Sequence, residues 1–284
     1  MKKKISLILI ACSLGLGAMA QVTLRVMSYN IRLDVESDGE NKWDLRKQRV
    51  TGLMKYHGAD FIGGQEVQEH QRLYILSQLD GFSSIGVGRD DGKTGGEYSC
   101  IFYNTKKYKL VKQSTFWLSA TPDTVSRGWD AACNRVCTYG LFMDKISRKL
   151  VWIFNTHFDH IGVEARRNAA KLILTRIASI NKENYPLIFM GDLNTHPDEE
   201  PAHIISSKLT NVRTVAKEVY GNADTWNAFH FGEKPNGCID YIFMSPNPNV
   251  KALSFATITD SYDMKYPSDH FPVLATFQLK TKDE

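Results

Sequence analysis

The 284-residue sequence is poor in cysteine, with only five, and it lacks internal repeats, low-complexity tracts and linkers rich in proline, glycine or serine. These absences exclude a small disulfide-stapled scaffold and favour one folded domain over several. What is present is 43% hydrophobic, 11% aromatic and 23% charged residues. That is the composition of an ordinary globular protein, neither disordered nor fibrous, with enough chain to bury a substantial core.

The sequence also lacks a marked excess of charge of one sign. Its formal net charge is +4, from 35 Lys and Arg against 31 Asp and Glu. Lys2, Lys3 and Lys4 are three of the basic residues, and without them the excess falls to one. A nearly neutral chain without a Lys/Arg run gives no electrostatic reason for tight non-specific binding to nucleic acid, although a local basic groove stays open.

Residues 1–20 have the pattern of a secretory signal peptide. A basic start is followed by a short apolar run, Ile5 to Leu16, and by the cleavage-site sequence Ala18-Met19-Ala20. The run is too short for a comfortable membrane span, and no other segment approaches that length. We therefore expect export to the periplasm or the medium, with residues 21–284 as one domain. Lipid attachment at Cys12 is the alternative, disfavoured because no linker follows it.

Four cysteines lie beyond the predicted signal peptide: Cys100, Cys133, Cys137 and Cys238. They allow three disulfide pairings, between which the sequence does not choose. Cys100 stands in an apolar run, so we expect it to be buried as a small hydrophobic side chain. Their spacing, without a nearby pair of histidines, is a poor match to a zinc site.

Short runs rich in β-branched and aromatic residues predict ten strands. The predicted strands are Val22–Tyr29, Phe61–Gly63, Phe82–Val87, Ser99–Tyr103, Val136–Met143, Leu150–Phe154, Leu187–Met190, Ile239–Met244, Ala252–Ile258 and Val273–Gln278. Apolar residues at helical spacing predict helices over Leu45–Tyr56, Glu69–Leu79 and Glu164–Ile180, the first with its stripe on Leu45, Arg49 and Leu53. Many strands and few helices, without strict alternation, predict an α+β fold of packed sheets with helices outside.

Polar residues recur where these strands end or begin. They are Asn30, Glu66, His157, Asp192, Asn194, Asp240, Asp269 and His270. Each alone is typical of a turn. If they converge, however, the carboxylates repel one another and raise one another's pKa unless a cation neutralises them. A donor set of oxygens without thiolate favours Mg²⁺, with Mn²⁺ or Ca²⁺ as alternatives, over zinc.

The motifs around these residues are MSYNIR, GGQEV, NTHFDH, GDLNT, IDYIF and SDHFPV. Their order resembles that of the endonuclease/exonuclease/phosphatase superfamily, over residues 24–277. The resemblance implies that residues 21–284 form one catalytic domain, a four-layer α/β/β/α sandwich of two mixed sheets with the site at one rim. The sequence is most similar to secreted bacterial members near the deadenylase-like exonuclease branch.

The resemblance also implies which residues bind the metal and the attacking water. Glu66 corresponds to the principal metal ligand, with Asn30 and Asp269 beside it. Asp192 corresponds to the residue that orients or deprotonates the attacking water, and Asn194 to its neighbour that fixes the scissile phosphate. Whether one or two metal ions bind is left open.

Two histidines complete the site that the resemblance implies. His270, held by Asp240, contacts the phosphate or acts as general base, so that either His270 or Asp192 is the base. His157 contacts a non-bridging phosphate oxygen. Glu97, which precedes a predicted strand, fits the carboxylate that pairs with His157 in the DNase-like branch.

A long loop from Phe116 to Tyr139 is the candidate for substrate contact. It carries Trp117, Arg127, Trp129 and Arg135. Exposed aromatics with arginines can stack a base or a sugar and clamp phosphates. The alternative is a loop held in place by one buried tryptophan.

These observations favour an exported phosphoesterase that hydrolyses phosphodiester bonds in single-stranded nucleic acid, a nucleotide or a small diester. The alternative is a phosphatase or sphingomyelinase-like hydrolase acting on small or lipid phosphates with the same site. A non-catalytic binding module is disfavoured because each of the six motifs keeps its polar residue. No apolar finger for bilayer insertion is evident, and we expect a monomer.

Overall fold

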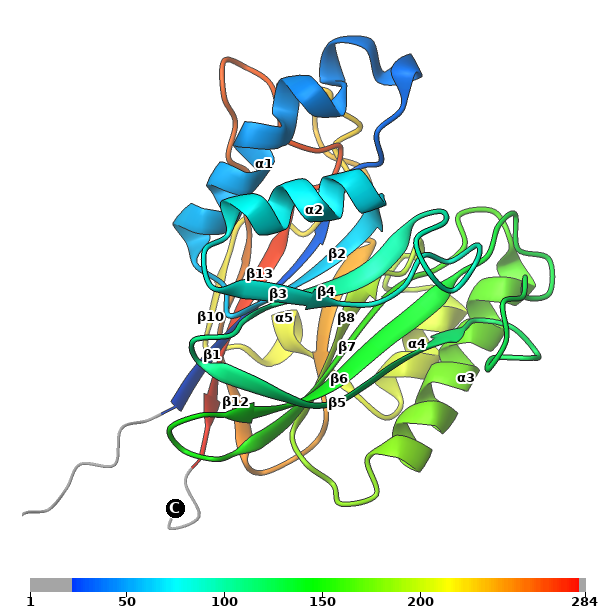
Figure 1. The fold of residues 1–284 in the computed structure, drawn as a ribbon, viewed down its shortest axis with the longest axis vertical. Coiled ribbons are helices and arrows are strands. Elements are labelled where there is room, and N and C mark those ends of the chain that lie inside the picture. Colours follow the sequence, from blue (N-terminus) through cyan, green and yellow to red (C-terminus); the bar gives the residue numbers. More distant parts are fainter. Residues whose placement is uncertain (1–21, 281–284) are drawn as a thin grey trace, which may run out of the picture.

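The computed structural model describes residues 22–280, so the predicted signal peptide and Cys12 lie outside it. Two β-sheets pack face to face, with helices on both outer faces (Figure 1). The predicted four-layer sandwich of two mixed sheets is therefore confirmed. No helix within the described range is long and apolar enough to cross a bilayer.

The larger sheet has seven strands and is mostly antiparallel, with parallel pairing between β1 and β2 and between β10 and β12. In spatial order its strands are β10 (Glu218–Tyr220), β12 (Val250–Thr257), β13 (Val273–Leu279), β1 (Val22–Asn30), β2 (Phe61–Val67), β4 (Tyr98–Asn104) and β3 (Phe82–Ile85). The parallel β1–β2 pair matters most for function, because it aligns the carboxyl ends of two strands at one rim of the sheet.

The smaller sheet has six strands, with one parallel pair, β7 and β8. In spatial order its strands are β5 (Tyr108–Trp117), β6 (Val136–Asp144), β7 (Leu150–His157), β8 (Leu187–Asp192), β11 (Asp240–Met244) and β9 (Thr210–Asn211). All ten predicted strands are present, most of them a little longer than predicted. The additional strands β5, β9 and β10 have weak signals, since β9 and β10 are short and β5 is mostly exposed and polar.

Helices cover the outer faces in two groups (Figure 1). On the larger sheet lie α1 (Trp43–His57) and α2 (Glu69–Gln78), and on the smaller sheet α3 (Val163–Ile180) and α4 (Glu200–Ser206). The short helix α5 (Val212–Val215) and the 3₁₀ helix η1 (Glu36–Asn41) complete the set. Helix α1 ends at Gly58, whose φ of 55° provides the left-handed conformation that favours glycine.

The buried face of α1 differs from the prediction. Leu45, placed on the apolar stripe, is 62% exposed. Trp43, Arg46 and Val50 face the sheet instead, together with Leu53. Arg46 can face the sheet because its guanidinium finds hydrogen-bond acceptors inside the protein.

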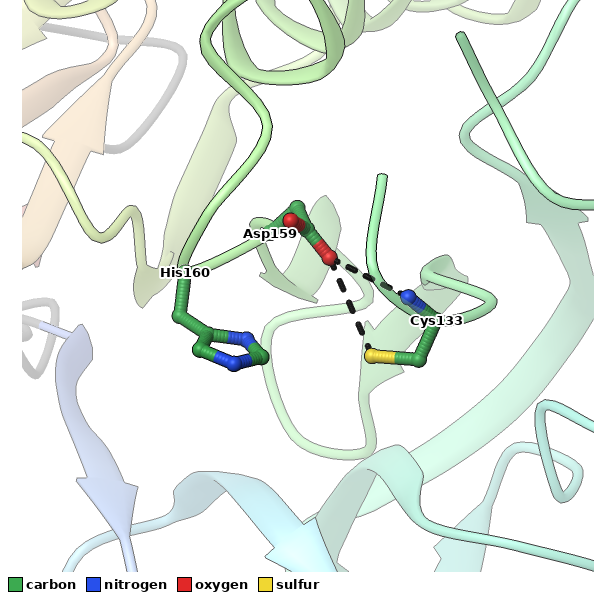
Figure 2. Close-up of side chains that lie close together, drawn as sticks. All are labelled: Cys133, Asp159 and His160. Atoms are coloured by element: carbon green, nitrogen blue, oxygen red, sulfur yellow. Dashed lines mark hydrogen bonds between the residues drawn. The ribbon is translucent and has the colours of Figure 1, made fainter. Parts of the chain in front are cut away.

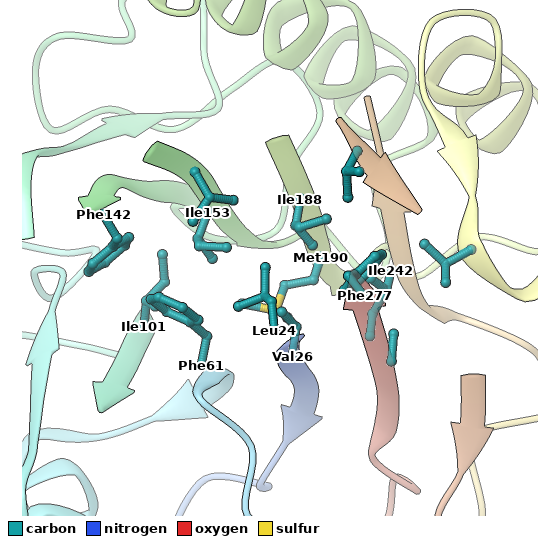
Figure 3. Packing of buried hydrophobic residues seen from close by; sticks show 14 of the residues in the cluster. Leu24, Val26, Phe61, Ile101, Phe142, Ile153, Ile188, Met190, Ile242 and Phe277 are labelled. Carbon is teal, nitrogen blue, oxygen red and sulfur yellow. The ribbon is translucent and has the colours of Figure 1, made fainter. Parts of the chain in front are cut away.

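The main core lies between the two sheets (Figure 3). Side chains from β1, β2 and β13 meet those from β6, β7, β8 and β11, as the alternation of inward-facing residues along strands requires. Phe61 of the larger sheet packs against Phe142 of the smaller one, with ring centroids 4.7 Å apart. Separate clusters lie beneath the two groups of helices.

Polar side chains also bridge the sheets, below the rim where β1, β2 and β7 end. Asn155 of β7 donates to the carbonyl oxygens of Gly64 (3.0 Å) and Cys100 (2.7 Å) in the other sheet. Its Oδ1 accepts from Gln65 Nε2 at 2.7 Å. Gly63 permits this approach, because a Cβ there would lie 2.7 Å from Asn155 Oδ1. We call Asn155 and Gln65 the inter-sheet bridge.

The four cysteines that the structure describes are free thiols. Cys100 is fully buried, as predicted, and burial raises its pKa to about 12. Cys137 is buried in β6, and Cys133 and Cys238 are partly buried.

Candidate active site

Three adjacent strands of the smaller sheet place Asp192 between two other predicted residues. In the parallel β7–β8 pair Asp192 is the register partner of His157, and in the antiparallel β8–β11 pair it is the partner of Asp240. All three side chains are almost completely buried. Their position at the end or start of a strand therefore brings them together, as the sequence pattern predicts.

The larger sheet contributes Asn30 from the end of β1 and Glu66 from β2. A bulge interrupts the β2–β4 pairing between Gly64 and Val67, and within it Glu66 has a φ of 57°. Left-handed backbone at a residue with a Cβ costs on the order of 1–3 kcal/mol and occurs where function requires it. Arg32 and Asn194, which also adjoin the site, have positive φ angles of 59° and 44°.

Asn30 joins the two halves of the site. Its Nδ2 lies 3.0 Å from both Glu66 Oε1 and Asp192 Oδ2, while its Oδ1 accepts the backbone N–H of Arg32. In this arrangement Asn30 turns an N–H group towards the carboxylates. It therefore orients two carboxylates, whereas the sequence predicted an oxygen ligand of the metal.

His270 is held by a buried carboxylate. Its Nδ1 lies 2.9 Å from Asp240 Oδ2, and its Nε2 lies 3.8 Å from Asp192 Oδ2. Burial opposes protonation, but the negative charges of Asp240 and Asp192 raise the pKa of His270 well above its usual value. The pairing predicted between Asp240 and His270 is thus present, and it fixes the orientation of the ring.

His157 has the opposite electrostatic environment. Burial, reinforced by the positive charges of Arg135 and Arg89, lowers its pKa well below the usual value. Its Nε2 lies 3.0 Å from Asn194 Nδ2 and 3.5 Å from Asp192 Oδ2. Asn194 Nδ2 also donates to the carbonyl oxygen of Phe158 at 3.1 Å, so the amide uses both of its N–H groups to hold the chain and the His157 ring. A neutral imidazole whose Nε2 accepts keeps one N–H, on Nδ1, that can donate to a ligand.

Asp192 is at the centre of these contacts. Burial, with the nearby charge of Asp240, raises its pKa to about 7, partly offset by His270 and Asn30. A carboxylate with a pKa near neutrality is suited to exchange a proton with water. Perturbed groups of this kind cluster at functional sites.

Glu66 and Asp269 are the residues that best fit a cation. Burial raises the pKa of Asp269, with repulsion from Glu66 adding to the effect. The guanidinium nitrogens of Arg32 lie 3.8 Å from Glu66 Oε2 and 3.9 Å from Asp269 Oδ2. The hydrogen bonds of this guanidinium, however, are donated to Asp38. Two largely buried, mutually repelling carboxylates with only oxygen donors fit a hard divalent ion such as Mg²⁺.

Arg46 supports this side of the site from beneath. Its guanidinium, 2% exposed, donates to five backbone carbonyl oxygens, those of Ile31, Arg32, Leu33, Asn41 and Pro267. It also lies over the rings of Trp43 and Phe229. Because residues 31–33 and 267 belong to the segments that carry Arg32 and lead to Asp269, Arg46 ties together two chain segments at the predicted metal site.

A cleft of about 530 Å³ opens above these residues. Of the four residues predicted to contact substrate, only Arg135 lines it. Trp117 is buried and donates from Nε1 to the carbonyl of Arg89 (2.7 Å), whereas Trp129 is 42% exposed away from the cleft and Arg127 is exposed. The alternative interpretation, a loop held by one buried tryptophan, is therefore the better description of residues 118–135.

The predicted pair between Glu97 and His157 is not formed. The carboxylate of Glu97 binds Arg89 instead, with nitrogen–oxygen distances of 2.6 and 2.9 Å. Glu97 and His157 nevertheless line the same small cavity. Sequence reasoning missed Arg89, although a signal exists: Arg89 and Glu97 flank a glycine-rich turn between two strands, where they can face each other.

Comparison with known proteins identifies relatives of this chain. A solved structure of a mannosyl-6-phosphatase from Bacteroides thetaiotaomicron is 35% identical, with a TM-score of 0.86, covering 89% of this chain and 99% of that one. A probable RNA exonuclease of Saccharomyces cerevisiae is 26% identical over 75% of this chain and 45% of its own length. An Acanthamoeba polyphaga mimivirus protein is 31% identical over 163 residues, 54% of this chain. The chain spans 60% and 31% of the two mimivirus proteins it matches.

Fold, site and relatives together define a phosphoric ester hydrolase. The model of the endonuclease/exonuclease/phosphatase family matches residues 27–270, and the chain belongs to that family. The resemblance inferred from the six motifs is thereby confirmed.

Proposed function

We propose that the protein is a divalent-metal-dependent phosphatase acting on small phosphate esters. The observation that carries this choice is the cleft above Asp192. Its volume of about 530 Å³ lies within the roughly 300–1,000 Å³ usual for small-molecule sites, and its lining is rich in charged side chains. The phosphatase relative, similar over nearly its whole length, supports the same choice. The sequence placed phosphodiester cleavage first and phosphatase activity second; on the size and lining of the cleft we propose the opposite order.

In the proposed reaction Asp192 accepts a proton from the water that attacks phosphorus. The bond from phosphorus to the alcohol oxygen breaks and that oxygen takes up a proton, so the products are inorganic phosphate and the alcohol. His270, fixed by Asp240, carries positive charge toward the phosphate, and neutral His157, held in place by Asn194, donates a hydrogen bond to a non-bridging oxygen. These groups stabilise the negative charge that grows on the phosphoryl oxygens. Glu66 and Asp269 would hold the divalent ion, which supplies further neutralisation of that charge when bound.

The test is a substrate panel offered to the purified protein with Mg²⁺, Mn²⁺ or Ca²⁺ and with EDTA. A hexose 6-phosphate and phenyl phosphate represent monoesters; bis(p-nitrophenyl) phosphate, single-stranded RNA and plasmid DNA represent diesters. We expect metal-dependent release of inorganic phosphate from monoesters at the highest kcat/KM. Faster cleavage of a diester would overturn the proposal.

Two substitutions test the site itself. Glu66→Ala and His270→Ala should each abolish turnover while the circular dichroism spectrum stays that of the wild type. The exposed Arg127→Ala is the matched control and should leave turnover unchanged. Wild-type rates in either site variant would refute the assigned roles.

Phosphodiester hydrolysis is the second candidate, favoured by one observation. Trp226 lines the cleft and is 38% exposed, so its ring is available to stack on a base. The RNA exonuclease relative points the same way. If Trp226→Ala lowers kcat/KM for single-stranded RNA about tenfold or more and spares small monoesters, this candidate gains; the stacking term is about 1–3 kcal/mol per base.

We also propose that the protein is exported, from the signal-peptide pattern of residues 1–20. Cell fractionation of the full chain tests this directly. Recovery of a mature protein beginning at Gln21 outside the cytoplasm is expected, and retention of the full-length chain in the cytoplasm would contradict it.

A further inference from the structure

One wall of the cleft is built from charged residues that the proposed reaction does not use. These are Arg89, Glu97, Arg135 and His160, which we call the lateral wall. Arg89 and Glu97 flank the turn between β3 and β4, Arg135 immediately precedes β6, and His160 follows β7. The wall adjoins the reaction centre, because His157 lines the cleft together with it.

Arg135 is the most unusual member of the lateral wall. It is 5% exposed; its Nε lies 3.4 Å from Asp159 Oδ2 and its Nη2 2.9 Å from His160 Nδ1. Its Nη1 is buried and has no hydrogen-bond partner among residues 22–280. Buried guanidinium groups normally satisfy their N–H donors, and an unfilled one needs an explanation.

The cluster of Cys133, Asp159 and His160 behind Arg135 offers ligand atoms close enough to suggest a second metal site (Figure 2). The hydrogen bonds of Asp159 argue against it. Oδ2 accepts from the backbone N–H of Ala132 at 3.1 Å as well as from Arg135, and Oδ1 accepts from Ile161 and Gly162. The cluster is therefore better described as the support that orients Arg135.

Arg89 and Glu97 form a second donor–acceptor pair in the same wall, with side chains only 15% and 14% exposed. Their two nitrogen–oxygen contacts of 2.6 and 2.9 Å hold both groups nearly fixed, and Trp117 anchors the backbone of Arg89. Arg89 Nε is also buried without a partner among the described residues. Between this pair, Arg135 and His157 lies a cavity of about 10 Å³, enough for roughly one water molecule.

The chemistry of the wall selects its ligand. A second anionic group would meet the carboxylate of Glu97, and stacking of a base would need an aromatic platform that these four residues do not provide. Hydroxyl groups both donate and accept, so a row of them matches alternating guanidinium and carboxylate groups. Resting on the phosphatase function proposed above, we propose that the lateral wall binds the hydroxyls of an uncharged polyhydroxylated alcohol, such as a hexose, as the leaving group of the phosphate ester.

The preference for a hydroxylated leaving group is the quantity to measure. The assay is the ratio of kcat/KM for a hexose 6-phosphate to that for phenyl phosphate, which has the same phosphate and no hydroxyls. Wild type should favour the sugar ester. Glu97→Gln and Arg135→Met should each lower the ratio about 10- to 100-fold, because a site that binds hydroxyls no longer distinguishes the two esters once the groups that bind them are removed. Arg127→Met, outside the cleft, should leave the ratio unchanged, and a thermal melt of each variant verifies that it is folded.

A second readout does not depend on turnover. Saturation-transfer NMR with the free hexose should give a signal with wild type and lose it in Glu97→Gln. If wild type hydrolyses phenyl phosphate but the ratio is the same in both variants, the lateral wall is not the hydroxyl site, and the phosphatase function stands. If no monoester is hydrolysed, the proposed phosphatase function is wrong, and the NMR signal alone tests hydroxyl binding by the lateral wall. A signal in wild type that is lost in Glu97→Gln supports hydroxyl binding at the wall. The absence of a signal in wild type overturns it.

Discussion

Replacing Arg46 with methionine should separate the support of the metal site from its chemistry. Methionine keeps an unbranched apolar stem of similar length and removes all of the donors. Arg46 touches none of the reacting groups, and its five acceptors are backbone carbonyls. Loss of function in this variant therefore reports the position of the chain segments around residues 31–33 and 267, together with the removal of a positive charge that lowers the pKa of Asp269.

The magnitude follows from which bonds are buried. The hydrogen bonds to Ile31 and Pro267 are fully buried, whereas those to Arg32, Leu33 and Asn41 are partly exposed, so water can replace the donor there. A buried polar group left without a partner costs about 1–3 kcal/mol. We therefore expect Arg46→Met to lower the free energy of unfolding by about 2–6 kcal/mol, a large part of the roughly 5–15 kcal/mol typical of a domain.

Two measurements check this. Urea unfolding followed by tryptophan fluorescence gives the stability, and the Mg²⁺ concentration for half-maximal activity should rise about tenfold, as when residues behind metal ligands are removed. Arg49→Met is the matched control on the same helix: Arg49 pairs with Asp263, whose side chain is 90% exposed, so about 0–1 kcal/mol is expected. An Arg46→Met protein within about 1 kcal/mol of wild type, with unchanged Mg²⁺ demand, would refute the reasoning.

Three further predictions concern pH and backbone packing. Asp159→Asn should lower the free energy of unfolding by about 1–3 kcal/mol at pH 7. Because backbone N–H groups hold the folded pKa of Asp159 below its unfolded value, the difference in stability between variant and wild type should shrink at pH 3 in urea titrations. An equal difference at both pH values would contradict this. Since the pKa of Asp192 is raised to about 7 and a bound cation can only lower it, kcat/KM should rise with pH to a plateau by pH 8, and a rate that falls from pH 6 to 8 would exclude Asp192 as the base. Thermal melts should show that alanine destabilises the protein at one glycine and stabilises it at another. Gly63→Ala, whose Cβ would lie 2.7 Å from Met190 Cε, should lower the stability by about 1–3 kcal/mol, whereas Gly52→Ala inside α1 should raise it by about 0.5–1 kcal/mol. A stabilised Gly63→Ala would be inconsistent with the close approach of the sheets.

Much of the site is predictable because strand ends carry it. His157 and Asp192 are the last residues of neighbouring parallel strands, and Asp240 is the first residue of the antiparallel neighbour. Sheet geometry alone then places them side by side. The same reasoning accounts for Asn30 at the end of β1.

The side-chain pairings and burial that the sequence did not predict depend on partners distant along the chain. Glu97 binds Arg89 and not His157, which only the course of the glycine-rich turn decides. Arg46 is buried because carbonyl groups from two separate segments surround it, and no periodicity reports that. Likewise Trp117 and Trp129 are both tryptophans of the predicted loop Phe116 to Tyr139, yet Trp117 is buried and Trp129 is exposed.

The inter-sheet bridge has a consequence for how activity relates to folding. Asn30 and Glu66 belong to the larger sheet, with Asp269 in the segment that leads to its strand β13. His157, Asp192 and Asp240 belong to the smaller sheet, so neither sheet alone contains the complete proposed reaction centre. Asn155 and Gln65 fix how far one layer can slide along the other just below that rim. We therefore expect turnover to report the alignment of the two sheets: during refolding, β-structure should return before activity does, because activity also requires the hydrogen bonds of these two amides.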